Sequence, residues 1–142
     1  ILNVNLLSNF YLSKGFIDRR VNRGNGSSIV FMSSISSIKG EAGLSMYSTT
    51  KGGLNSFAKS LAKESAPQGI RVNTILAGLV KTDLIEKWSS IYTKEYLDIA
   101  ENDYPLGISS AEDISSKILF LLSNKSSKMT GSEILVDGGI TL

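Results

Sequence analysis

The chain has 142 residues, a net charge of +2 and neither cysteine nor histidine. This composition excludes a disulfide framework, a thiolate metal site and a Ser-His-Asp triad, so proton chemistry must use Tyr, Lys, Asp or Glu side chains. The charge is too small to indicate nucleic-acid binding, and no apolar run is long enough for a membrane span or a signal peptide. We therefore expect one globular domain with no metal, no nucleic acid and no membrane as partner.

The apolar residues of the first half indicate helices that alternate with strands. Helical spacing runs through residues 3–20, and the short apolar run at 29–33 is typical of a buried parallel strand. An apolar stripe that starts at Leu54 predicts a long helix, which Pro67 ends. The β-branched run at 70–76 predicts the next strand.

The second half continues this alternation. The residues "SAED" at 110–113 predict a capping box, which opens a helix that continues to Leu122. The segment 133–137 predicts a third strand, which ends at two glycines. Strands that alternate with helices of these lengths predict an α/β fold with a parallel sheet and right-handed crossovers.

Polar side chains from a strand and from a helix are expected to meet at one edge of this sheet. Ser33 and Ser34 end the first strand, and Tyr47 and Lys51 open the helix that follows it. Ligands of parallel α/β sheets bind beyond the carboxyl ends of the strands. A cation one helical turn from a phenol favours the phenolate form, and such a tyrosine can exchange a proton. By itself the Tyr-x-x-x-Lys spacing equally fits a packed tyrosine beside a surface lysine.

The residues around this pair resemble the central signature of the classical short-chain dehydrogenase/reductase family. Segment 31–84 places Ser34 thirteen residues before Tyr47, and the Tyr-x-x-x-Lys motif, a long apolar helix and "GIRVN" follow in order. Segment 3–14 resembles the family's Asn-bearing helix, and segment 104–142 resembles its closing part. The resemblance therefore covers essentially the whole chain.

The resemblance implies an oxidoreductase that transfers a hydride between NAD(P)(H) and a carbonyl or secondary alcohol. By this resemblance, Tyr47 is the general acid or base, and Lys51 stabilises its phenolate and holds the nicotinamide ribose. Ser34 hydrogen-bonds the substrate oxygen, where alkoxide charge develops. Asn5 holds a water in the proton relay. The alternative interpretation is a catalytically inactive fragment or association module of such an enzyme.

The cofactor implied by the resemblance is NAD or NADP, and the choice between them cannot be read from these residues. The implied cofactor-binding residues are Tyr47, Lys51, Gly78, Val80 and Thr82, the last three near the nicotinamide carboxamide. The family's glycine-rich turn for the pyrophosphate follows a strand. The only similar stretch here, "GNGSSI" at 24–29, precedes a strand and is interpreted as an ordinary turn.

We therefore expect residues 1–142 to be the catalytic and C-terminal portion of one Rossmann-like, doubly wound domain whose N-terminal glycine-rich half is absent. The strand at 29–33 would then have a bare edge, and the chain alone would be poorly soluble or partly unfolded. The resemblance also implies a homodimer or homotetramer, formed through the helices after residues 3 and 47, and a cytoplasmic enzyme.

Two positions depart from the family pattern. Ala77 replaces a proline, which removes a fixed φ and predicts a looser loop on the nicotinamide side. Ser37 stands where many members have glycine. Ser33, Ser36 and Ser37 are alternative serines to Ser34, but only Ser34 has the family spacing, and loop hydrogen bonding explains the others more simply.

The substrate implied by the resemblance is a small carbonyl or alcohol compound. The resemblance is loosely nearest to 3-oxoacyl-[acyl-carrier-protein] reductases, although sugar, steroid and polyol enzymes use the same residues. Within the irregular segment 82–104, Trp88, Tyr92 and Tyr96 recur every four residues. They fit either the substrate lid that the family carries in this region or a core-facing helix stripe.

Overall fold

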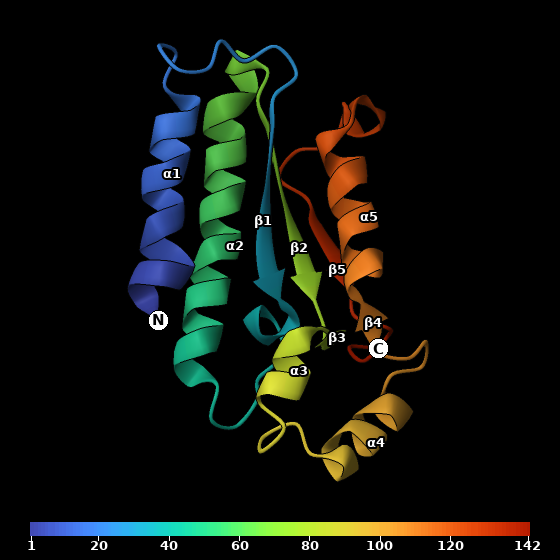
Figure 1. The fold of residues 1–142 in the computed structure, drawn as a ribbon. Coiled ribbons are helices and arrows are strands. Elements are labelled where there is room, and N and C mark those ends of the chain that lie inside the picture. The colour runs from blue at the N-terminus through green and yellow to red at the C-terminus, as the bar shows by residue number, and fades with distance from the viewer.

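The computed structural model describes residues 1–142, apart from the side chain of Glu86. Its centre is a parallel three-stranded sheet in the order β1-β2-β5, formed by β1 (Ser28–Ser34), β2 (Arg71–Ala77) and β5 (Glu133–Val136). Helix α2 (Ser45–Ser65) lies against one face of the sheet, and α5 (Ala111–Leu122) lies on the other side (Figure 1). The α/β architecture with a parallel sheet is thus confirmed, and each predicted strand boundary is within one residue.

Every residue of β2 is buried, because this strand lies between two neighbours and is covered on both faces. Its polar residues are buried as well, and the side chains of Arg71 and Asn73 are held there by hydrogen bonds to backbone carbonyls. The register pairs Ser34 of β1 with Ala77 of β2, and Ala77 with Val136 of β5. The carboxyl ends of the three strands therefore lie together at one edge.

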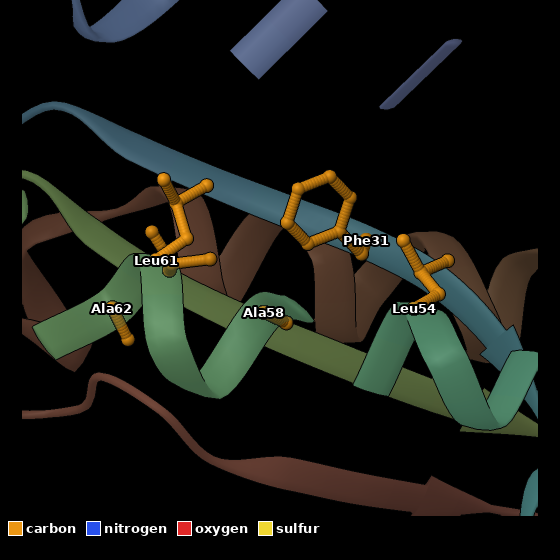
Figure 2. Close-up of a cluster of buried hydrophobic side chains, with 6 residues drawn as sticks. Phe31, Leu54, Ala58, Leu61 and Ala62 are labelled. Carbon is orange, nitrogen blue, oxygen red and sulfur yellow. The ribbon is translucent and has the colours of Figure 1, made fainter. Parts of the chain in front are cut away.

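The main core lies between α2 and the sheet. Leu54, Ala58 and Leu61 form the inner face of α2 and pack with Phe31 of β1 and Val72 of β2 (Figure 2). The helix begins at Ser45, well before this apolar stripe. Its first turns therefore extend beyond the core to the carboxyl edge of the sheet.

The helix predicted over residues 3–20 is shorter and less regular than expected. It begins as a π-helical segment, η1 (Asn3–Leu7), and continues as α1 (Ser8–Ile17). It ends early because Asp18 forms a turn instead, in which its carboxylate accepts the backbone N–H and guanidinium of Arg20. Phe10 of α1 packs edge-on against Phe57 of α2, so α1 lies alongside α2 (Figure 1).

The stretch "GNGSSI" is the turn that its position indicated. Gly24 and Gly26 have positive φ, and a Cβ atom at Gly24 would lie 1.8 Å from the carbonyl oxygen of Gln68. Glycine is required at position 24 for both reasons. The turn packs on the 3₁₀ segment η3 (Ala66–Gln68), at the end of the sheet opposite to Ser34.

Segment 82–104 forms two short helices, α3 (Asp83–Lys87) and α4 (Lys94–Asp103). The interpretation of Trp88, Tyr92 and Tyr96 as a core-facing stripe of one helix is therefore wrong. Trp88 directly follows α3, Tyr96 lies in α4, and both are exposed. The rings of Tyr92 and Tyr96 pack against each other with centroids 5.9 Å apart.

The remaining elements are short, except for α5. A two-residue parallel pair joins β3 (Val80–Lys81) to β4 (Ser109–Ser110), and the 3₁₀ segments are η2 (Ile35–Ser37) and η4 (Asn124–Ser126). The predicted capping box is confirmed, because Ser110 and Asp113 exchange hydrogen bonds at the start of α5. Among the described residues, no helix is both long and apolar enough to cross a membrane.

Candidate active site

The start of α2 is joined directly to the end of β1. The ammonium of Lys51 donates a hydrogen bond to the carbonyl of Met32 at 2.8 Å, and the Ser33 hydroxyl donates to the carbonyl of Lys51 at 3.3 Å. These contacts place Lys51, and Tyr47 one turn before it, beside Ser34 at the end of β1. The structure thus brings together three of the four residues that the sequence analysis assigned to catalysis.

Lys51 is half-buried and lies near the face of the Tyr47 ring. Its Nζ atom is 5.6 Å from the ring centroid, which is within the range of a cation–π contact. Burial lowers the pKa of Lys51, because desolvation penalises the charged form. An ammonium has three N–H donors, so Lys51 can hold the Met32 carbonyl and still donate to a ligand.

Ser34 is held in a tight turn at the end of β1. Its Oγ caps η2 by accepting the backbone N–H of Ser36 at 3.2 Å, and it lies 3.3 Å from the Ser36 hydroxyl. Its carbonyl accepts a hydrogen bond from the Ser37 hydroxyl at 2.6 Å. The single hydroxyl proton of Ser34 donates to Ser36 Oγ, so the hydroxyl must rotate to donate to an oxygen of a bound molecule.

Asn5 reaches the same region from η1. Its Nδ2 atom donates to the Thr50 hydroxyl at 3.3 Å, and Thr50 in turn donates to the carbonyl of Tyr47 at 2.7 Å. The Asn5 carbonyl accepts a hydrogen bond from Asn9 Nδ2 at 2.9 Å. The π-helical turn around Asn5 is the kind of helix irregularity that is frequent at functional sites.

The three other assigned residues lie on the loop that follows β2. Gly78 donates its backbone N–H to the Val136 carbonyl, and a Cβ atom there would lie 3.0 Å from the ring of Tyr104. Val80 belongs to β3, and the exposed Thr82 precedes α3. A cavity of about 650 Å³ opens beside Thr82. These residues share the sheet edge with Ser34 but form a second group, on a neighbouring loop.

The loop after β2 is held by a contact that the sequence analysis missed. Tyr104, buried against Ala100 and Ile108, accepts the N–H of Leu79 on its hydroxyl oxygen at 2.9 Å. Burial is the main cause that raises the pKa of Tyr104. We expected a looser loop because Ala77 replaces proline, but the structure instead shows a tyrosine holding it. Nothing in the local pattern could signal this contact, since Tyr104 lies 25 residues from Leu79.

A smaller cavity, of about 310 Å³, opens next to the Ser34 turn. Ile35, Ser36 and Lys39 line one side of it. Tyr96 of α4 and Tyr104 line the other side. The cavity combines apolar and charged groups that suit a small organic molecule, and its lining begins at Ile35, the residue after Ser34. Tyr96 is thus the member of the aromatic trio that borders this space.

The donors present fit the nicotinamide–ribose end of a dinucleotide. Lys51 offers N–H donors that match ribose hydroxyls, and the Thr82 hydroxyl is exposed on the next loop. The sequence contains no Gly-x-Gly-x-x-Gly motif for a pyrophosphate, so the fit concerns this end of the molecule alone.

A family profile described as enoyl-(acyl carrier protein) reductase matches residues 1–141. The chain is 40% identical over 141 residues to the 3-oxoacyl-[acyl-carrier-protein] reductase FabG of Buchnera aphidicola subsp. Baizongia pistaciae, which covers 99% of this chain and 56% of that protein. It is 36% identical over 143 residues to a tropinone reductase homologue of Arabidopsis thaliana, which covers 99% of this chain and 52% of that protein.

A solved structure, 4-hydroxyisoleucine dehydrogenase complexed with NADH, has the same fold over the shared region. It matches with a TM-score of 0.90 at 31% sequence identity, covering 99% of this chain and 58% of that chain. The chain thus spans about half the length of the curated relatives and solved structures that it matches.

Proposed function

This chain belongs to the short-chain dehydrogenase/reductase family, and on that premise we propose that the whole protein transfers a hydride between NAD(P)(H) and a small carbonyl or secondary alcohol. The observation that carries the proposal is the contact of Lys51 with both the end of β1 and the ring of Tyr47. It gathers a hydroxyl, a phenol and a cation at the sheet edge where ligands of such folds bind.

Tyr47 is the proposed acid and base. It gives a proton to the substrate oxygen during reduction and takes it back during oxidation. The Lys51 ammonium near its ring places a positive charge beside the proposed site of proton transfer. Lys51 also holds the ribose hydroxyls of the cofactor, which orients the nicotinamide toward the substrate. When bound, the nicotinamide supplies or accepts the hydride.

Ser34 is proposed to donate its hydroxyl proton to the same substrate oxygen. This donor stabilises the negative charge that develops on the oxygen as the carbonyl becomes an alkoxide. The N–H of Ser36 on Ser34 Oγ supports this orientation. Asn5 is proposed to hold a water that links the relay to solvent, and its connection through Thr50 to Tyr47 supports that role.

Gly78, Val80 and Thr82 are proposed to contact the carboxamide of the nicotinamide. Their place on the loop after β2, at the same edge as Ser34, supports this assignment. The proposed substrate is a small carbonyl compound in the cavity beside Ser36. Several relatives are named as reductases of 3-oxoacyl-[acyl-carrier-protein], which supports a 3-oxoacyl thioester.

We also propose that the whole protein is a cytoplasmic homodimer or homotetramer. The exposed apolar side chains on η1 and α1, which include Val4 and Leu12, support association through this helix. This surface is likewise the observation that favours the second candidate function, a non-catalytic association module.

The test is the turnover of Tyr47→Phe in the whole protein. NADH and NADPH oxidation are followed with acetoacetyl-CoA, a small 3-oxoacyl thioester, and with a panel of simple ketones. Loss of the phenolic proton should lower kcat by more than about a hundredfold while cofactor binding changes little. Tyr11→Phe, an exposed substitution on α1, is the matched control. Undiminished turnover in Tyr47→Phe contradicts the assigned role, and no turnover of any carbonyl by the unaltered protein favours the association module.

A further inference from the structure

A buried amide on α2 takes no part in the proposed mechanism. Asn55 is only 5% exposed, and its Nδ2 atom donates to the hydroxyl of Ser37 at 2.9 Å. Its Oδ1 atom is buried and, among the described residues, has no hydrogen-bond partner. A half-satisfied buried amide costs stability compared with an apolar residue of the same size. Asn55 therefore needs a reason other than packing.

The hydrogen bond from Asn55 is the first of two in series. The Ser37 hydroxyl accepts from Asn55 and donates to the carbonyl of Ser34 at 2.6 Å. A hydroxyl that accepts one hydrogen bond becomes a better donor for the next, so the two bonds strengthen each other. The series ends on the backbone of the serine proposed to hold the substrate oxygen.

A second connection lies on the other side of Ser34. The Ser33 hydroxyl donates to the backbone carbonyl of Lys51, and Lys51 lies one helical turn before Asn55. Ser34 is thus held from both sides to consecutive turns of the helix that carries Tyr47. Ser33 uses only backbone of that helix, whereas Ser37 depends on the side chain of Asn55.

We propose that Ser37 and Asn55 act together as positioning residues, which fix Ser34 relative to Tyr47 and Lys51. The inference rests on the proposed function. It also explains why serine stands at position 37, since glycine there would leave the Asn55 amide without this partner and the Ser34 carbonyl without this donor. Small displacements of a group that contacts the reacting oxygen have large effects on rate.

The experiment compares Ser37→Ala, Asn55→Leu and the double variant in the whole protein, with acetoacetyl-CoA and the preferred nicotinamide cofactor. We expect each single variant to lower kcat about tenfold and to change the KM for the cofactor less than about twofold. Ser37→Thr keeps the hydroxyl, so its kcat should be close to that of the unaltered protein. Ser56→Ala, an exposed substitution on the same helix, is the control for the loss of a serine hydroxyl.

The double variant separates positioning from stability. Ser37→Ala leaves a buried amide without a partner and should lower the thermal midpoint, while replacing both partners by apolar groups should recover much of it. The kcat should stay low in the double variant, because the Ser34 carbonyl still lacks its donor. If Asn55→Leu does not fold, the comparison of Ser37→Ala with Ser37→Thr decides.

Three results would overturn the inference. If kcat recovers with the thermal midpoint in the double variant, the pair is merely structural. If Tyr47→Phe is inactive while Ser37→Ala and the double variant turn over normally, the positioning role fails and the proposed function stands. If the unaltered protein reduces no carbonyl compound, the proposed function is wrong. The positioning role is then wrong as well, because it rests on that function.

Discussion

A single hydroxyl group supports the loop that follows β2. The oxygen of Tyr104 accepts the N–H of Leu79, and the ring packs beside Gly78, where a Cβ atom would be only 3.0 Å away. We expect Tyr104→Phe to lower the free energy of unfolding by about 1–2 kcal/mol at pH 7, because it leaves a partly buried N–H without a partner. Urea denaturation measures this loss, and Tyr11→Phe on the exposed side of α1 is the control.

The pH dependence of that loss provides a second check. The folded-state pKa of Tyr104 is raised, chiefly by burial, so the stabilisation is complete below the unfolded pKa of about 10. It is lost as the pH rises through the higher folded-state pKa. The difference between the unaltered protein and Tyr104→Phe should therefore shrink above about pH 10. A difference that stays constant into this alkaline range contradicts the assignment.

Helix α5 is fixed at its carboxyl end by a buried arginine of β2. The Arg71 guanidinium donates to the carbonyls of Leu121, Ser123 and Ser126, the last two just beyond the end of the helix. A cation is favourable here, because the carboxyl end of a helix carries partial negative charge. Arg71 thereby joins the first residue of β2 to the end of α5 and to η4.

We expect Arg71→Met to destabilise the fold by about 3 kcal/mol, because several carbonyls lose their donor at once in a buried place. The midpoint of urea unfolding measures the effect, and Arg19→Met at an exposed position controls for the loss of a positive charge. Arg71→Lys should recover only part of the loss, since an ammonium lacks the planar fork. Equal stability of the Met variants at the two positions overturns the role given to Arg71.

These contacts mark what the sequence could predict and what it could not. Short runs of apolar and β-branched residues located β1, β2 and β5, because such runs are typical of buried strands. The spacing of Tyr47 and Lys51 indicated their common direction. The two-residue strands β3 and β4 are too short for any period to be visible.

The supporting contacts of the site were missed for another reason. Asn55 reaches Ser37 across 18 residues, and Tyr104 reaches Leu79 across 25. Pairings of this kind depend on how elements pack, which local pattern does not encode. Thr50 links Asn5 to Tyr47 through two hydrogen bonds. The sequence indicated this only weakly, by placing a polar residue on the inner face of α2 just before Lys51.

The molecule exposes many large apolar side chains to solvent. Strand β1 pairs with β2 alone, so its other side presents unpaired backbone groups. Val4 on η1 is 74% exposed and Leu119 on α5 is 67% exposed, so apolar side chains are open to solvent on both helical layers. Unpaired strand edges and such patches both favour association.

We therefore predict that the 142-residue chain, expressed by itself, associates or is partly unfolded. Size-exclusion chromatography with light scattering should give species larger than a monomer, and thermal unfolding should be broad or irreversible. Val4→Lys and Leu119→Lys test the cause, because a charge in an apolar patch should reduce association without touching the core. Exposed Lys63→Gln on α2 controls for a change in net charge. A sharp, reversible transition of a monomer would show that the bare edge of β1 and these apolar faces are tolerated in water.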